Sequence, residues 1–212
     1  MAEFARLLRD NRNYRYTWIG QIVSEVGDHF NNIAVLSLAL HNKGSGLAVA
    51  GVMLARALPA IVAGPLAGVA LDRFNRRHVM IASDLVRAVI ASAFMLCIGN
   101  KDNTLLFVLS ALLMSASPFF SSGRSAILPA IASKEQLHIA NSTTQTTMWL
   151  TTAIGAWGGG LSVAKFGYPA AFFLNAMSFL FSAWAIWNLK PTHGEFDSGR
   201  SAASKRLSPW KD

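Results

Sequence analysis

The sequence predicts an all-α protein that crosses a membrane with six transmembrane helices. Hydrophobic residues make up 52% of its 212 residues and charged residues only 14%. The apolar residues gather in runs of about 20, the length that crosses a hydrocarbon layer about 30 Å thick. The charges lie mostly at the ends of the chain and in short connections between these runs. Composition and charge placement together favour a polytopic bundle over a soluble basic protein.

Six apolar runs define the expected spans, and short polar connections separate them. Residues 1–15 form a basic N-terminal arm on the cytoplasmic side. Residues 191–212 form a basic tail rich in serine, which we expect to be disordered. The first span contains Glu25 and Asp28 and is too long for a cleavable signal peptide. The transmembrane bundle is expected over 16–190, with spans at 16–40, 47–71, 79–99, 104–120, 140–163 and 170–189.

The distribution of basic residues predicts the orientation. Three lysines, Lys43, Lys101 and Lys165, fall in the odd-numbered connections, against fourteen basic residues on the other side. Cytoplasmic loops carry the excess of lysine and arginine, so both termini are expected in the cytoplasm of a bacterial-type plasma (inner) membrane. Topology therefore explains the net charge of +8, and no nucleic-acid partner is expected. The fourteen are Arg6, Arg9, Arg12, Arg15, Arg73, Arg76, Arg77, Arg124, Lys134, Lys190, Arg200, Lys205, Arg206 and Lys211.

A polar stripe runs along the first span. Gln21, Glu25, Asp28 and Asn32 are spaced four, three and four residues apart, which places them on one face of a helix. An ionisable group inside a membrane span costs about 2.5–3.5 kcal/mol, so this face must line the bundle interior. We predict that the stripe belongs to a pathway for substrate or protons.

Arg56 of the second span lies at a similar depth, so it joins the predicted pathway as a partner of Asp28. The pair would either handle substrate or protons or simply neutralise charge where two helices pack. Glu25 has no obvious partner. It is therefore a candidate proton carrier, or else it faces water.

The connection after the second span is a charged hairpin, residues 68–77. Positive-inside topology explains its arginines but not its glycine, which stands four residues before an aspartate. We interpret the hairpin as a conformational-switch loop formed by Gly68, Asp72, Arg73, Arg76 and Arg77.

Two further pairs have meaningful spacings. Asp84 and Arg87 lie three residues apart on the third span and can meet on one face. We assign them to the switch loop, as a pair that holds the loop and the helix ends in one state. Gly155 and Gly159 form a G-x-x-x-G pair in the fifth span, a spacing that lets helices pack closely.

The hairpin resembles the loop signature of the major facilitator superfamily, G-x-x-x-D-[RK]-x-G-[RK]-[RK], with Asn75 where that family prefers glycine. The resemblance implies a left-handed backbone conformation at Asn75, which asparagine tolerates best after glycine. Other segments are similar to the branch that contains macrolide-efflux and enterobactin-exporter permeases. The sequence at 155–160 reads G-A-W-G-G-G, where the superfamily's antiporters have G-P-x-x-G-G. The similar segments are 24–28, 56–59, 64–68, 84–88, 124–129, 140–142 and 173–179.

This resemblance implies that the chain is the N-terminal half of a proton-coupled efflux permease for small amphipathic molecules such as drugs or siderophores. Complete members have two six-helix halves, so the expected partners are the bilayer, a small-molecule substrate and a second six-helix half from another chain or another copy. The alternative is a truncated, non-transporting membrane protein or an interaction subunit.

An enzymatic function is not expected. A six-span intramembrane protease would need a histidine facing a serine, and none of the five histidines falls in spans four to six. The sequence offers no cluster of metal ligands and no phosphate-binding loop, so no metal or cofactor is expected.

Overall fold

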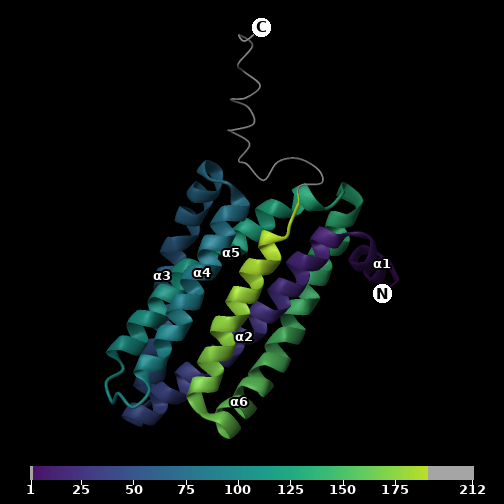
Figure 1. Cartoon of the computed structure of the whole chain (residues 1–212). Helices are drawn as coiled ribbons and strands as arrows, with labels where there is room; N and C mark the ends of the chain where they lie inside the picture. Colours follow the sequence, from purple (N-terminus) through teal and green to yellow (C-terminus); the bar gives the residue numbers. More distant parts are fainter. Residues whose placement is uncertain (1, 191–212) are drawn as a thin grey trace.

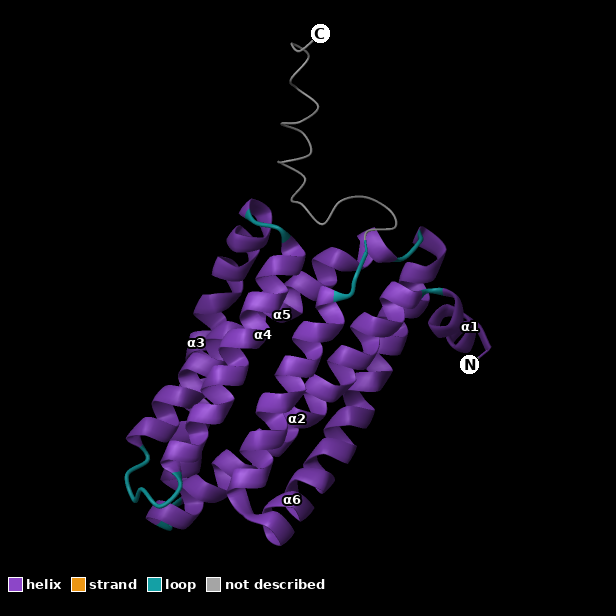
Figure 2. Ribbon diagram, in the orientation of Figure 1, coloured by secondary structure: helices purple, strands orange, loops and turns teal. Residues whose placement is uncertain are grey.

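The structure is a computed structural model that describes residues 2–190, and over this range it is a helical bundle without strands (Figure 2). The prediction of an all-α membrane protein is therefore confirmed. The predicted disorder of the tail falls on residues 191–212, outside the described part. The elements are α1 (Ala2–Asp10), α2 (Arg12–Lys43), α3 (Gly46–Arg73), α4 (Arg76–Ala93), the short 3₁₀ helix η1 (Phe94–Cys97), α5 (Thr104–Ile131) and α6 (Lys134–Trp187).

Helix α6 is one continuous element in sequence but two legs in space. Gly167 has a φ of +76° and a ψ of −180°, which no helical residue adopts, and Pro169 follows two residues later. The positive φ is a conformation that glycine reaches without steric cost. The chain reverses here, and the second leg runs back antiparallel to the first with α2 between them (Figure 1). The fifth and sixth predicted spans correspond to these two legs.

Within residues 2–190, four helices are long and apolar enough to cross a membrane: α3, α4 with η1, α5 and α6. Helix α2 has 32 residues, about 48 Å at 1.5 Å per residue, and is also long enough. It is less apolar than these four helices because it carries the polar stripe. With α6 counted as two legs, the bundle has six crossings.

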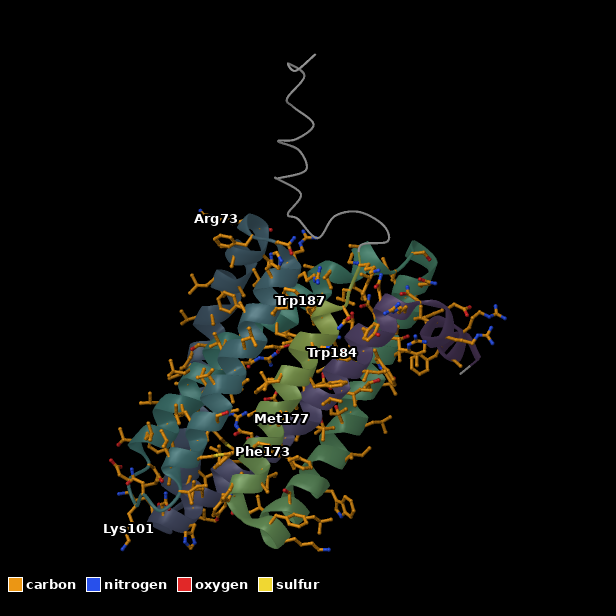
Figure 3. The ribbon with its side chains drawn as sticks, in the orientation of Figure 1. Arg73, Lys101, Phe173, Met177, Trp184 and Trp187 are labelled. Atoms are coloured by element: carbon orange, nitrogen blue, oxygen red, sulfur yellow. The ribbon has the colours of Figure 1, made fainter. Side chains whose placement is uncertain are left out.

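The two legs of α6 enclose α2, and α3, α4 and α5 form the other side of the bundle (Figure 1). The second leg turns large side chains outwards, at Phe173, Met177, Trp184 and Trp187 (Figure 3). Each of these is between 46% and 62% exposed, which suits a surface that meets lipid rather than water.

Two expectations about local structure are wrong. Asn75 has a φ of −61° and is not left-handed. It is instead the N-cap of α4, where its side-chain oxygen accepts from the backbone N–H groups of Arg77 and His78. The fourth predicted span ends at residue 120, whereas α5 continues to Ile131. Arg124 is therefore a helix residue and not part of a cytoplasmic loop.

The N-terminal arm contains a short amphipathic helix, α1, which the sequence analysis did not identify. Leu7 is buried on one side and Arg6 and Arg9 are exposed on the other. The ring of Phe4 packs edge-on against Trp18 of α2, with centroids 5.3 Å apart. These contacts fix the arm against the bundle.

Replacing Gly27 by alanine is expected to destabilise the bundle. A Cβ atom at Gly27 would lie 2.8 Å from the Cβ of Ser178 and 2.9 Å from Oδ1 of Asn175, both in the second leg of α6. Overpacking of this kind costs about 1–3 kcal/mol. The measurement is the free energy of unfolding in mixed detergent micelles. Gly160→Ala is the control, since a Cβ atom there meets nothing within 4 Å, and equal stabilities for the two variants would contradict the prediction.

Candidate functional site

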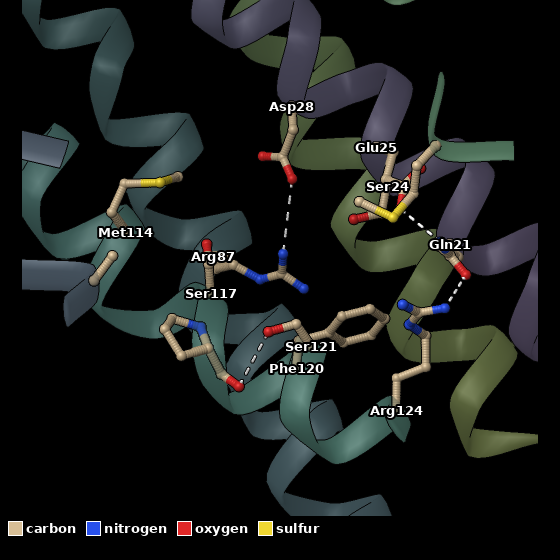
Figure 4. A pocket seen from close by; sticks show the side chains of 13 residues that line it. Gln21, Ser24, Glu25, Asp28, Arg87, Met114, Ser117, Phe120, Ser121 and Arg124 are labelled. Atoms are coloured by element: carbon tan, nitrogen blue, oxygen red, sulfur yellow. Dashed lines mark hydrogen bonds and ion pairs between the residues drawn. The ribbon is translucent and has the colours of Figure 1, made fainter. Parts of the chain in front are cut away.

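A cavity of about 250 Å³ opens inside the bundle and contains most of the predicted polar stripe (Figure 4). Gln21, Glu25 and Asp28 of α2 line it, as predicted for one helix face. The opposite wall comes mainly from α5, which contributes apolar and hydroxyl side chains. Residues of the other elements complete it, and the full lining is Gln21, Ser24, Glu25, Asp28, Ala60, Arg87, Met114, Ser117, Pro118, Phe120, Ser121, Arg124 and Met148.

One side of the cavity contains a chain of hydrogen bonds across three helices. Arg124 donates to Oε1 of Gln21 at 2.5 Å, and the Gln21 amide donates to Oε1 of Glu25 at 2.6 Å (Figure 4). The Thr151 hydroxyl donates to Oε2 of Glu25 at 2.8 Å, and Arg124 also reaches Thr144 at 3.4 Å. Glu25 therefore has partners, contrary to expectation, but both are neutral groups.

The other side of the cavity contains a buried charge network. Arg87 of α4 forms an ion pair with Asp84, and its NH1 lies 3.8 Å from Oδ2 of Asp28 on α2 (Figure 4). Its guanidinium also lies over the rings of Phe120 and Phe179, at 4.7 and 4.4 Å from the ring centroids. Cation–π contacts of this kind help to hold a cation in a desolvated site.

Asp28 and Arg56 form no direct ion pair within residues 2–190, but their charges still attract each other. Arg56 donates to Oδ1 of Asn32 at 2.9 Å, while Asp28 faces Arg87. Asn32 thus belongs to the predicted stripe but contacts Arg56 of α3 instead of lining the cavity. Arg87, which the sequence analysis grouped with the switch loop, instead lines the cavity beside Asp28.

The charged hairpin joins α3 to α4 at the end of the bundle opposite Lys101 (Figure 3). Asp72 and Arg73 are exposed, and their side chains form no hydrogen bond or ion pair with any residue in the range 2–190. Arg76 donates to the carbonyl of Ala126 at 3.0 Å. Arg77 donates to the carbonyls of Ile186 and Trp187, so the base of the hairpin is tied to α5 and α6. Gly68 lies in open space.

The two glycines of the G-x-x-x-G pair lie directly against α2. A Cβ atom at Gly155 would be 2.7 Å from Cβ of His29, and one at Gly159 would be 3.1 Å from Cα of Phe30. The first leg of α6 can therefore approach α2 closely enough for Thr151 to reach Glu25.

Sequence reasoning missed Arg124 as a cavity residue. The signal was present, because Ser117, Ser121 and Arg124 are spaced four and three residues apart and lie on one face of a helix. This stripe faces the stripe of α2 across the cavity. It was overlooked because the fourth span was ended at residue 120, before the arginine.

Six membrane crossings around an interior cavity with ionisable groups from several helices define a polytopic membrane protein of the transporter class. The sequence profile described as Major Facilitator Superfamily matches residues 17–212. The chain belongs to this superfamily. No solved structure gives a significant match.

Several curated bacterial proteins are similar to the chain. An uncharacterized MFS-type transporter of Bacillus subtilis, YfiS, is 29% identical over 86% of this chain and 43% of its own length. The multidrug efflux pump Tap of Mycolicibacterium fortuitum is 30% identical over 78% of this chain and 42% of its own length. Macrolide efflux protein A of Streptococcus pyogenes is 27% identical over 57% of this chain and 30% of its own length. The chain thus spans less than half the length of these relatives.

Proposed function

We propose that the chain forms the N-terminal half of a proton-coupled exporter of small amphipathic molecules. The observation that carries the proposal is the cavity, where Glu25, Asp28, Arg87 and Arg124 meet among apolar side chains. A cavity of this kind offers charged groups for protons and an apolar wall, including Phe120, for substrate. The printed names of the relatives, which include a multidrug efflux pump and a macrolide efflux protein, support export over uptake.

The proposal includes a second six-helix half, supplied by another chain or another copy. Members of transporter folds built from repeats bind substrate at the interface between halves and work by rocking one against the other. Asp72 is exposed and free of partners within residues 2–190, which supports a contact with a helix of that second half. Arg76 and Arg77 of the same hairpin donate to carbonyls of α5 and α6, and these hydrogen bonds restrict the position of Asp72.

Export by a reconstituted pair of halves tests the proposal. The chain is expressed in an efflux-deficient bacterium alone and together with the part of YfiS outside the segment that matches this chain, and export of a panel of cationic, neutral and anionic amphipathic dyes is measured. We expect gradient-dependent export of at least one dye by the pair. The chain alone is expected to self-associate or to be degraded, and a flux-competent monomer would contradict the half-transporter proposal. A correctly inserted pair that exports no dye would favour the alternative, a non-transporting subunit.

The proposal places both termini and the hairpin in the cytoplasm. Asn13 donates to the carbonyl of Lys190 at 2.5 Å, so the start and the end of the bundle lie at the same face. Single cysteines are introduced into a Cys97→Ala background and labelled with a membrane-impermeant maleimide on intact cells. Cysteines at Lys43 and Lys101 are expected to react, and a cysteine at Arg73 is expected to react only after lysis. The reverse pattern would overturn the orientation.

A further inference from the structure

An apolar groove of about 320 Å³ lies on the outer surface of the bundle, between α3, α4 and α5 and separate from the central cavity. Its floor contains Ala116 and Phe119 of α5, and Ala70 of α3 forms one side. The only hydroxyl in its lining belongs to Ser83, which donates to the carbonyl of Ala116 at 2.8 Å and is therefore satisfied. The groove thus offers no polar group to a ligand along its length.

The shape of the groove follows from side-chain size and helix spacing. The groove is lined by one face of α4, because Ala82, Ser83 and Val86 follow Val79 by three, four and seven residues. Small side chains there and at Ala70 leave space that leucine would fill. Val86 is 50% exposed, so no helix of the described part covers this face.

The bilayer itself supplies an occupant for this apolar groove, since an acyl chain is as apolar as the lining. Apolar contact alone gives little selectivity in lipid, because exchanging one hydrocarbon neighbour for another has no hydrophobic driving force. Selectivity must therefore come from a polar group at the end of the groove.

Arg73 provides that group. It lies three residues after Ala70 on α3, which places it on the same face and one turn nearer the end of the bundle. Its side chain is exposed and makes no hydrogen bond or ion pair within residues 2–190. The hairpin 72–77 carries three arginines against one aspartate, so the local charge is positive.

We propose that this groove and Arg73 form a binding site for an anionic glycerophospholipid of the leaflet on the hairpin side. One acyl chain lies along the α4 face of Val79, Ala82 and Val86, and the phosphate of the headgroup contacts Arg73. In the proposed orientation this is the cytoplasmic leaflet, where anionic lipids attract basic segments. The site lies beside the switch loop but does not depend on the export activity.

Native mass spectrometry of the full chain, purified and delipidated in detergent, tests the proposal. Phosphatidylglycerol, phosphatidylethanolamine and phosphatidylcholine with the same acyl chains are titrated separately. We expect phosphatidylglycerol to bind roughly fivefold more tightly than phosphatidylcholine, the effect of one arginine near the headgroup. Arg73→Gln should remove this preference, whereas Lys101→Gln, at the opposite end of the bundle, should keep it.

A second pair of variants tests the groove. Ala82→Phe fills it and should weaken the binding of all three lipids, while Leu96→Phe, at an apolar position that is 71% exposed and outside the groove, should not. Circular dichroism verifies folding, and Val86→Phe replaces Ala82→Phe if the latter fails to fold. If Ala82→Phe and Leu96→Phe bind phosphatidylglycerol equally well, the lipid does not occupy the groove. If Arg73→Gln and Lys101→Gln bind it equally well, Arg73 does not recognise the headgroup. Either result would contradict the proposed site. Tighter binding of phosphatidylethanolamine than of phosphatidylglycerol would contradict the proposed anionic headgroup. It would indicate that Asp72 recognises the ammonium group of the lipid.

Discussion

Arg87→Leu is expected to destabilise the bundle by about 3–5 kcal/mol, because it leaves Asp84 as a buried charge without a partner. The Asp84 side chain is fully buried and the Arg87 side chain is only 4% exposed, so water cannot replace the lost partner. The substitution also removes the cation from between Phe120 and Phe179 and takes the counter-charge from Asp28. The measurement is the free energy of unfolding in mixed micelles.

The double variant Asp84→Leu/Arg87→Leu separates a charge effect from a packing effect. Replacing both members of a buried ion pair by apolar residues is often neutral, whereas removing one member is strongly destabilising. We therefore expect the double variant to recover most of the stability lost in Arg87→Leu. A double variant as unstable as the single one would show that Arg87 stabilises the bundle through its ring contacts or through Asp28, and not through Asp84.

The fold was largely predictable because the membrane imposes a strong constraint on sequence. Apolar runs of the right length and the polar connections between them locate six crossings, including the reversal in α6 at Gly167. The ends of helices were less predictable. Pro118 lies inside α5 and does not end it, and nearby hydroxyls such as that of Ser117 donate to backbone carbonyls of the same helix. A prediction that ends the fourth span where the apolar run ends, at residue 120, therefore makes the helix too short.

The candidate site was predictable within a helix but not between helices. The spacing of Gln21, Glu25 and Asp28 predicts a shared face, and these three residues do line one cavity. The depth of Arg56 suggested Asp28 as its partner, but depth does not determine which helices are neighbours around the cavity. Helix α4 packs against α5 and α6, and from there the long side chain of Arg87 reaches Asp28 across the cavity, an arrangement that residue spacing does not encode.

For the proposed exporter, we expect Asp28 to be the carboxylate of the cavity that couples protons to motion. Its Oδ2 faces Arg87 at 3.8 Å, while Oδ1 is buried without a hydrogen-bond partner among the described residues. Asp84 competes for the same guanidinium from within α4. We expect protonation of Asp28 to shift Arg87 towards Asp84 and so to weaken the ion pair that links α2 to α4, whereas the hydrogen bonds to Glu25 come from neutral donors.

Asp28→Asn in the assembled transporter is expected to reduce gradient-driven export to the background of the empty strain. Asparagine keeps the size of the side chain but cannot change charge, so the contact with Arg87 no longer depends on a proton. Insertion and stability should be preserved, since Asp84 still neutralises Arg87. Uphill export and downhill substrate exchange are measured in proteoliposomes, and exchange should persist while uphill export is lost. Ser117→Ala is the matched control, because it lines the same cavity without a titratable group. Normal uphill export by Asp28→Asn would show that the aspartate is only a structural partner of Arg87, and loss of coupling in Glu25→Gln alone would assign the proton to Glu25.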